Sequence, residues 1–543
     1  MTRSRALSVV AVLLGALVIG VAGAAAASSP RLASCSDSWK SPVSGVWGAG
    51  VNWSTGVIPS NADNVCITVP GTYTVTLAPW SLGTADPNNN GASVNSLTLG
   101  LGGGAGTQTL DIAGQGSTSN SNEQLSTVFL NVVTTSTIAA RGALVLDSTD
   151  GGSQLPGNPI GGDAVLSGAT VLNYGSVTAE IQDAKNKYAN TTQIEAPLTN
   201  EAGASVQDGS GTLEVAAITN YGTFTVAPRA ELSVVNLAGF ASPSSFTNDG
   251  KLVNNGSILA QQGSGPLTWT QAGGYVKGNV VTLQSGATLV DKAGAAQFLV
   301  NYADANIKGT IPAVQKITVV GGAYNYQGDN YNVTALGLDH STVVNDGTLV
   351  LVTQGSGNKT GGAVTVNDGS IDNKGTILAE IKDPSWNVQY EAGLTNTHTG
   401  NLTVTGGTFT DGGGAPVTNH GTVTVGPRAL FLLEEASAFM NKSDGRIVSE
   451  ISSTKSLGQF ELVSPCCAGP GRFVAGGTLA PVLKSGHAPA ANTDFQLFLL
   501  SGGSFKGTFA HLGRRFTADY AHESASPAFV GAVYDKSGKK AKG

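Results

Sequence analysis

The sequence is poor in charge and in helix-forming side chains. Only 12% of its 543 residues are Asp, Glu, Lys or Arg, against about 25% in an ordinary globular chain. Because Glu, Lys and Arg favour helices, their scarcity argues against a helical protein. The formal net charge of −7 is small for this length, so the composition also argues against a nucleic-acid partner.

Long apolar runs are missing after the first 27 residues. Residues 6–27 are almost wholly apolar, follow Arg3 and Arg5, and end in the small residues Ala25-Ala26-Ala27. A basic start, an apolar middle and a small-residue end are typical of a cleaved signal peptide. We therefore predict a signal peptide over 1–27, a secreted or extracellular protein associated with the cell surface, and no membrane span after cleavage.

Glycine, threonine, asparagine, serine and valine take the place of the charged residues. The chain has 74 glycines, about twice the usual frequency. Its apolar fraction of 41% is ample for a core, so the chain is not of the disordered class. Turn-forming and β-branched residues together predict an all-β protein.

Part of the sequence is present twice. The segment TNYGTFTVAPRA (219–230) returns as TNHGTVTVGPRA (418–429), and NYGSVTAEIQD (173–183) returns as NKGTILAEIKD (373–383). The repeated segments keep their order, which indicates a duplicated block, at about 141–253 and again at about 346–448. These are called the first and the second block below.

A shorter unit recurs inside each block, namely Asn-x-Gly followed by residues of alternating polarity. Asparagine and glycine both tolerate left-handed backbone, which suits a tight turn, and alternation with period two indicates a half-buried strand. Neighbouring units lie about 22 or 46–47 residues apart, the spacing of stacked repeats of about 23 residues. The asparagines of these units are Asn173, Asn220, Asn248, Asn254, Asn345, Asn367, Asn373 and Asn419.

Stacked units of this length predict a single-stranded, right-handed parallel β-helix, a pectin-lyase-like β-solenoid with capped ends. One unit cannot bury its own apolar face, so successive coils must share a core. The turn asparagines are then expected to stack as amide ladders. About 20 coils at roughly 4.8 Å each give a rod on the order of 90–100 Å long. A row of β-sandwiches is the alternative, although it would repeat at about 100 residues.

Both ends of the mature chain differ from the repeats. Residues 38–77 contain Trp39, Trp47 and Trp53, and residues 476–512 end in Gly507-Thr508-Phe509. The first segment resembles the opening W-x-NW-S-x-G-x-x-P of bacterial secreted β-strand-repeat proteins, which are related to autotransporter passenger and filamentous-haemagglutinin-like β-solenoids. The second is similar to their closing segment, although no translocator barrel follows here. The residues that carry the opening resemblance are Trp47, Asn52, Trp53, Ser54, Gly56, Pro59, Ser60, Asp63, Val65, Ile67, Gly71, Tyr73, Val75 and Leu77.

The resemblance and the repeats together suggest an order of segments along the mature chain. We expect a Trp-rich cap and solenoid start over 28–77 and a solenoid over 78–475. A C-terminal capping segment is expected over 476–535, followed by a flexible basic tail over 536–543. That tail suggests a weak association with anionic wall polymers.

The four cysteines test the rod geometry. In a rod, the N-terminal pair cannot reach the C-terminal pair, so Cys35 is predicted to pair with Cys66. Cys466 and Cys467 are then neighbours, either as a strained vicinal disulfide or as thiols. A lipobox-like sequence before Cys35 leaves a lipid anchor at that residue as an alternative.

No catalytic, metal or cofactor motif is apparent in the sequence. Its aspartates lie mostly in turns, its six histidines are scattered, and His420 occupies the variable position of an Asn-x-Gly turn. We therefore predict a non-enzymatic structural or adhesive protein with no cofactor. A carbohydrate-binding or polysaccharide-cleaving β-helix is the alternative.

Two loops at matching positions of the duplication are the candidate contact sites. Residues 182–193 contain Tyr188, and residues 382–390 contain Trp386 and Tyr390. Aromatic rings on protruding loops can stack on sugars or anchor a protein. Glycans, or surface proteins of a host or neighbouring cell, are therefore the predicted partners, and packing of these rings onto the rod is the alternative.

Overall fold

The alternating segments form short strands whose apolar side chains point into the molecule. In β19 (Thr223–Val226), Phe224 and Val226 are fully buried while the two threonines are half-exposed. In its duplicate β44 (Thr422–Val425), Val423 and Val425 are buried in the same way. The predicted period of two is therefore confirmed in both blocks.

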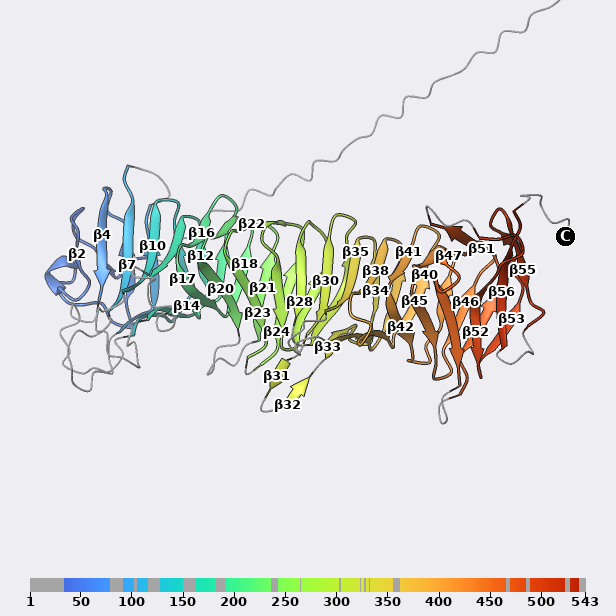
Figure 1. Ribbon diagram of the computed structural model, residues 1–543. Helices are drawn as coiled ribbons and strands as arrows, with labels where there is room; N and C mark the ends of the chain where they lie inside the picture. The colour runs from blue at the N-terminus through green and yellow to red at the C-terminus, as the bar shows by residue number, and fades with distance from the viewer. Residues whose placement is uncertain are drawn as a thin grey trace, which may run out of the picture.

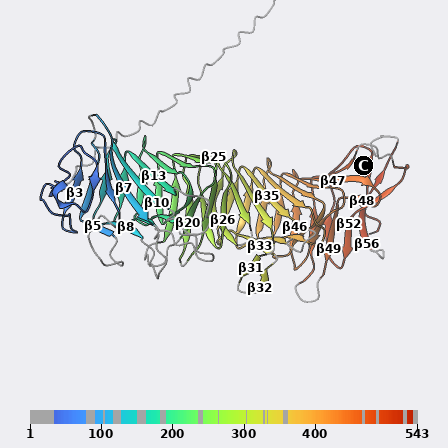
Figure 2. The ribbon, with the colours of Figure 1, turned by 60° about the vertical axis from the view of Figure 1, so that its left-hand side comes forward.

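The strands stack into an elongated rod with the N-terminal part at one end and the C-terminal part at the other (Figure 1). A view turned by 60° shows the same elongation (Figure 2). The computed structural model describes residues 34–78, 91–101, 105–115, 127–149, 163–181, 191–235, 243–263, 265–301, 304–322, 324–326, 329–331, 333–354, 362–464, 469–484, 489–522 and 528–536.

Up to β30 (Lys316–Gly321), consecutive strands belong to different sheets, and neighbours within a sheet come from successive coils. One coil consists of β15 (Leu198–Asn200), β16 (Ser205–Asp208) and β17 (Gly211–Val215). The next consists of β18 (Ala217–Asn220), β19 and β20 (Ala230–Val235). Each strand pairs in parallel with its counterpart in the coil before. The all-β fold and the parallel solenoid predicted from the sequence are thus confirmed.

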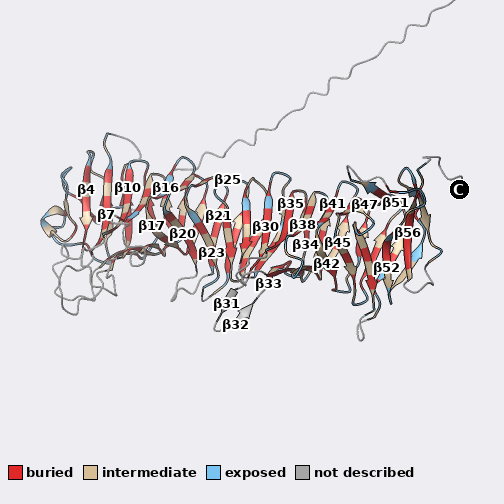
Figure 3. Ribbon diagram, in the orientation of Figure 1, coloured by how far each residue is buried: buried red, intermediate tan, exposed pale blue. Residues whose placement is uncertain are grey.

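The core is a continuous strip of buried side chains along the rod (Figure 3). Aliphatic residues fill most coils, and rings from successive coils stack on one another. In the second half, adjacent ring centroids lie 4.9–5.8 Å apart. This core is what one coil alone cannot build. The rings in contact, some stacked and others edge-to-face or tilted, are Phe224, Phe246, Trp269 and Phe298 in the first half and Tyr390, Phe409, Phe431, Phe460 and Phe498 in the second.

Buried amide ladders line one corner of each block, as predicted. In the first block, Asn173 donates to Asn200 at 2.8 Å, and Asn200 donates to Asn220 at 2.8 Å. Asn220 donates to Asn248 at 3.0 Å, and Asn248 to Gln271 at 3.4 Å. Because Asn173, Asn200 and Asn220 also donate to backbone carbonyls of the next coil, the ladder holds the corner together.

The second block has a matching ladder. Asn345, Asn373, Asn396, Asn419 and Asn441 each donate to the next over 2.7–2.8 Å. The members at 200, 396 and 441 were not predicted, because their turns are longer than Asn-x-Gly. Two predicted turn residues, Asn254 and Asn367, lie at other corners.

The arrangement of the sheets changes between the two blocks, at β29 (Ala305–Ile311). The first residues of β29 pair with β33 (Val333–Gly337), and its last residues pair with β34 (Thr342–Asn345). The nine-stranded sheet that contains β19 ends just before, at β25 (Tyr275–Gly278). Between the two blocks, the nine-stranded sheet thus ends, and the 27-stranded sheet divides into two rows of strands.

Duplicated strands consequently lie on different sheets. β19 belongs to the nine-stranded sheet, whereas its duplicate β44 pairs with β41 (Asn401–Thr405) and β47 (Arg446–Ser453). Those strands belong to the same sheet as β20. The second block is therefore shifted by one face around the rod relative to the first.

The N-terminal end is closed by three tryptophans and a disulfide. Trp39, Trp47 and Trp53 are buried with edge-to-face rings 4.9–5.1 Å apart, and the Trp53 indole donates to the Trp47 carbonyl. Cys35 and Cys66 form the disulfide that the sequence predicted. This segment covers the apolar end of the first coils.

The C-terminal end is closed by a change of strand direction. β56 (Ala528–Tyr534) runs antiparallel to β52 (Asp494–Ser501) and to β55 (Phe516–Asp519). Phe509 follows Gly507 and is buried under this cover. This antiparallel cover pairs the outer edge of β52, so no further parallel strand can extend the sheet there. Cys466 and Cys467, residues 1–27 and most of the basic tail lie outside the described residues.

Candidate functional site

Two of the three predicted contact residues, Trp386 and Tyr390, lie among the described residues. Tyr188 lies outside the described residues. Trp386 is half-buried in a turn, where its backbone amide donates to Asp383. The assignment of Tyr390 as a contact residue is wrong, because this side chain is fully buried. Its ring stacks on Phe409, and its hydroxyl donates to the Gly393 carbonyl at 3.2 Å.

A shallow hollow of about 380 Å³ lies on the outer side of the solenoid in its N-terminal half. Four successive strands of one sheet supply its floor: β5 (Gly91–Val94), β8 (Val128–Val132), β11 (Ala164–Gly168) and β14 (Thr191–Ile194). Outward-facing positions of a parallel sheet fall into rows, so four coils present one mixed surface. Its lining residues are Ser93, Thr127, Phe129, Asn131, Val165, Ser167, Gln193 and Glu195.

Phe129 is the aromatic residue of this hollow. Its ring lies over Gly91 of the preceding coil, where an added Cβ would lie 2.2 Å from a ring carbon. Glycine at position 91 therefore makes room for the ring. Asn131 beside it donates to Ser93 at 3.0 Å, which fixes the amide next to the ring.

The Glu195 carboxyl lines the hollow, and the carboxyls of Glu214 and Asp163 contact other residues of the same strands. Burial raises the pKa of Glu195 and of neighbouring Glu214, although a hydrogen bond from Gln193 partly offsets the shift at Glu214. Burial also raises the pKa of Asp163, which accepts from the Thr191 amide. These groups retain protons to higher pH than exposed carboxyls do.

The hollow combines an apolar ring with hydrogen-bonding groups, which is a surface on which a sugar chain can bind. Phe129 offers an apolar ring, while Asn131, Gln193 and Glu195 offer hydrogen-bonding groups beside it. Hydrolysis of a glycoside ordinarily needs two carboxyls that face the same bond. Among the described residues that line the hollow, Glu195 is the only carboxyl.

Three further aspartates, Asp208, Asp291 and Asp411, are buried in the interior. Burial raises the pKa of each of these carboxyls to about 8, and nearby Glu231 adds to the effect at Asp208. The Gln315 amide donates to Asp291, whereas both carboxyl oxygens of Asp208 and of Asp411 lack hydrogen-bond partners. Because they face the core, these groups affect stability and are not exposed to a ligand.

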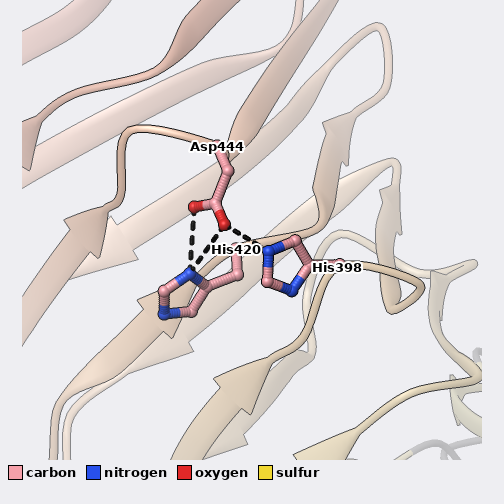
Figure 4. A group of neighbouring side chains, drawn as sticks. All are labelled: His398, His420 and Asp444. Carbon is pink, nitrogen blue, oxygen red and sulfur yellow. Dashed lines mark hydrogen bonds and ion pairs between the residues drawn. The ribbon is translucent and has the colours of Figure 1, made fainter.

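A second polar group lies at the asparagine corner of the second block (Figure 4). His398, His420 and Asp444 come from three successive turns that follow the ladder residues 396, 419 and 441. The Asp444 carboxylate lies 2.5 Å from His398 Nε2 and 2.9 Å from His420 Nδ1. The two imidazole rings stack with centroids 5.5 Å apart.

Two effects compete at Asp444. Its partial burial raises the pKa, but hydrogen bonds from its own backbone and from His420, together with the nearby imidazoles, lower it more. The net result is a pKa below the ordinary value, so Asp444 is a carboxylate at neutral pH. This carboxylate joins the three turns.

The sequence interpretation missed this group. The sequence predicts scattered histidines, because His398 and His420 do not have the spacing of a recognised metal-binding motif. The available signal was that each residue follows a ladder asparagine, since turns at one corner of a solenoid lie one above another. The prediction that the histidines do not cluster is therefore wrong for these two.

Comparison with known proteins gives no further assignment. No family model matches the chain, and none of the curated proteins is significantly similar to it. Within the described part of the chain, no helix has the length and apolar character needed to cross a membrane.

Proposed function

We propose that this protein is a non-enzymatic, secreted or cell-surface β-solenoid that serves as an extracellular structural or adhesive rod. The observation that carries the proposal is the continuous core between two closed ends. Because the described interior is filled with apolar side chains and amide ladders, contact chemistry belongs to the outer surface. The signal-like N-terminus and the resemblance to secreted β-strand-repeat proteins support the location.

Fractionation of producing cells tests this proposal. We expect the mature chain in the medium or at the cell surface, accessible to added protease, and bound to isolated envelope or matrix polymers without releasing reducing sugars. Retention in the cytoplasm would refute the location, and polymer degradation by the purified chain would refute the non-enzymatic role.

The hollow around Phe129 supports glycan binding as a second candidate function. We expect Phe129→Ala to abolish binding on a glycan array, because the ring supplies the apolar contact. Trp386→Ala is the matched control, as it removes a half-buried ring outside the hollow. Loss of binding in Trp386→Ala alone would instead place the contact on the predicted loop.

The chain length of the polysaccharide after incubation distinguishes binding from cleavage. Incubation of the purified protein with each polysaccharide bound on the array should leave its chain length unchanged. Shortening that disappears in Glu195→Gln would revive the polysaccharide-cleaving alternative.

A further inference from the structure

The corner group of the second block has the composition of a transition-metal site. Two imidazole nitrogens and one carboxylate oxygen are ligands that Zn²⁺, Ni²⁺ and Cu²⁺ accept readily, whereas Mg²⁺ and Ca²⁺ prefer oxygen alone. One ligand atom from each of His398, His420 and Asp444 can be chosen so that all three lie within 4.8 Å of one another. We propose that these three residues bind one divalent transition-metal ion, with Zn²⁺ as the reference ion.

The distances are close to those of a three-ligand site. Bonds of 2.0–2.2 Å to a tetrahedral ion place neighbouring ligand atoms roughly 3.4 Å apart. Asp444 oxygens lie 2.5–3.1 Å from the two histidine nitrogens. A displacement of less than about 1 Å would therefore admit the ion, and water would complete its coordination.

The backbone beneath these side chains is preorganised by the ladder. Asn396 donates to Asn419 and Asn419 to Asn441, each over 2.7 Å, so the three turns keep a fixed spacing. The turns also continue directly into paired strands β41, β44 and β47. Ligands held on rigid elements lose little conformational entropy on binding.

Exposure allows an ion to enter from solvent. The His398 side chain is 74% exposed, and those of His420 and Asp444 are 34% and 35% exposed. A metal ion binds a deprotonated imidazole nitrogen, so a proton held on that nitrogen passes to water when the metal binds. The bound ion would connect three successive coils.

The first block provides a natural comparison. Tyr221 of the first block corresponds to His420 of the second. The Asp249-Gly250 turn of the first block corresponds to Asp444-Gly445 of the second. Tyr221 lacks the imidazole nitrogen, although the ladder beneath it is the same. The metal site is therefore specific to the second block, and His420→Tyr recreates the corner of the first.

Titration with Co²⁺ and Zn²⁺ tests the proposal on the full mature chain, produced without a polyhistidine tag. We expect one equivalent of Co²⁺ to bind with visible d–d absorption, to be displaced by Zn²⁺, and to be released in acid, because metal ligands must be deprotonated. His398→Ala, His420→Tyr and Asp444→Asn should each weaken binding by at least about 10-fold.

The matched control is His522→Ala, which removes the histidine of another His/Asp group, formed with Asp494 and Asp519 near the C-terminus. This variant should bind like the wild type. Absence of saturable binding, binding unchanged by His398→Ala and His420→Tyr, or loss of binding in His522→Ala alone would each overturn the proposal. Unchanged circular dichroism and melting of the apoproteins will show that each variant is folded.

Discussion

The first and second blocks have the same type of corner, an asparagine turn with its ladder. Their matching strands, however, lie on different faces of the rod. Arg229 and Arg428, at matching positions of the twelve-residue repeat, both have left-handed backbone, with φ of 76° and 64°. The strands before them nevertheless lie on different sheets. What the duplication preserved is thus the turn with its ladder and not the position of each strand around the rod.

At the corner itself, the two blocks differ mainly in the side chains that do not belong to the ladder. The ladder asparagines are buried in both blocks, whereas the residues next to them vary from Tyr221 to His420. A solenoid can therefore change the chemistry of one edge while its backbone stays constant. Four predictions test how alike the two blocks are.

The largest effect on the free energy of unfolding is expected when matched ladder asparagines are replaced by alanine. Asn200 and Asn396 each accept one amide hydrogen bond and donate another over 2.7–2.8 Å. Alanine at either position leaves buried donors and acceptors unpaired, at about 1–3 kcal/mol each. We expect Asn200→Ala and Asn396→Ala to lower the free energy of unfolding by a similar amount, about 3–5 kcal/mol, in urea titrations monitored by circular dichroism.

Hydrogen exchange locates this loss. Protection should fall in the coils that flank each substitution and remain elsewhere, since a solenoid is stabilised between neighbours. A large loss for one variant and none for the other would show that the two ladders are not equivalent.

A smaller effect is expected where the blocks differ in the core. GTLEV (211–215) of the first block corresponds to GTFTD (407–411) of the second, so Val215 corresponds to Asp411. We expect Asp411→Val to stabilise the protein by on the order of 3 kcal/mol at pH 7, because it removes a buried carboxyl without partners.

The same residue predicts a pH dependence. The unfolded chain releases this proton near pH 4, while burial keeps it on the folded protein up to about pH 8. The unfolded state therefore binds fewer protons in this window, and the free energy of unfolding falls as pH rises, by about 1.4 kcal/mol per pH unit for each such group. Thermal melts of Asp411→Val between pH 4 and 8 should show a shallower fall; an unchanged slope would contradict the raised pKa.

The smallest effect is expected at the two arginines with positive φ. Glycine adopts this conformation without the steric cost that a Cβ brings. Arg229→Gly and Arg428→Gly should each raise the free energy of unfolding by about 0.5–1 kcal/mol, measured by urea titration. Destabilisation by either variant would mean that the arginine side chain makes a contact that outweighs its strain.

The sequence predicted the solenoid because its signal is local and repeated. The Asn-x-Gly turns, the alternation in segments such as 223–226 and the Cys35–Cys66 pairing all follow from short-range pattern or from the geometry of a rod. The ladder members Asn200, Asn396 and Asn441 escaped because their turns insert extra residues before the glycine.

The site residues were harder to predict, because they depend on which turns are neighbours. Tyr390 has the alternating pattern of its strand and faces the core, so its place near a turn misled the interpretation. The hollow at Phe129 and the group at Asp444 arise from residues of separate coils. The shift of face at β29 has no local sequence signal, because either face accepts the same alternating strand.

Cysteine trapping across matched ladder strands tests the stacked arrangement most directly. Thr199 lies beside Thr219 in the first block, and Thr395 beside Thr418 in the second, in parallel register. Cysteine pairs introduced at these positions should each close to a disulfide under mild oxidation, identified by peptide mapping, whereas a mixed pair at 199 and 418 should not. Failure of either matched pair, or closure of the mixed pair within one molecule, would contradict the duplicated corner.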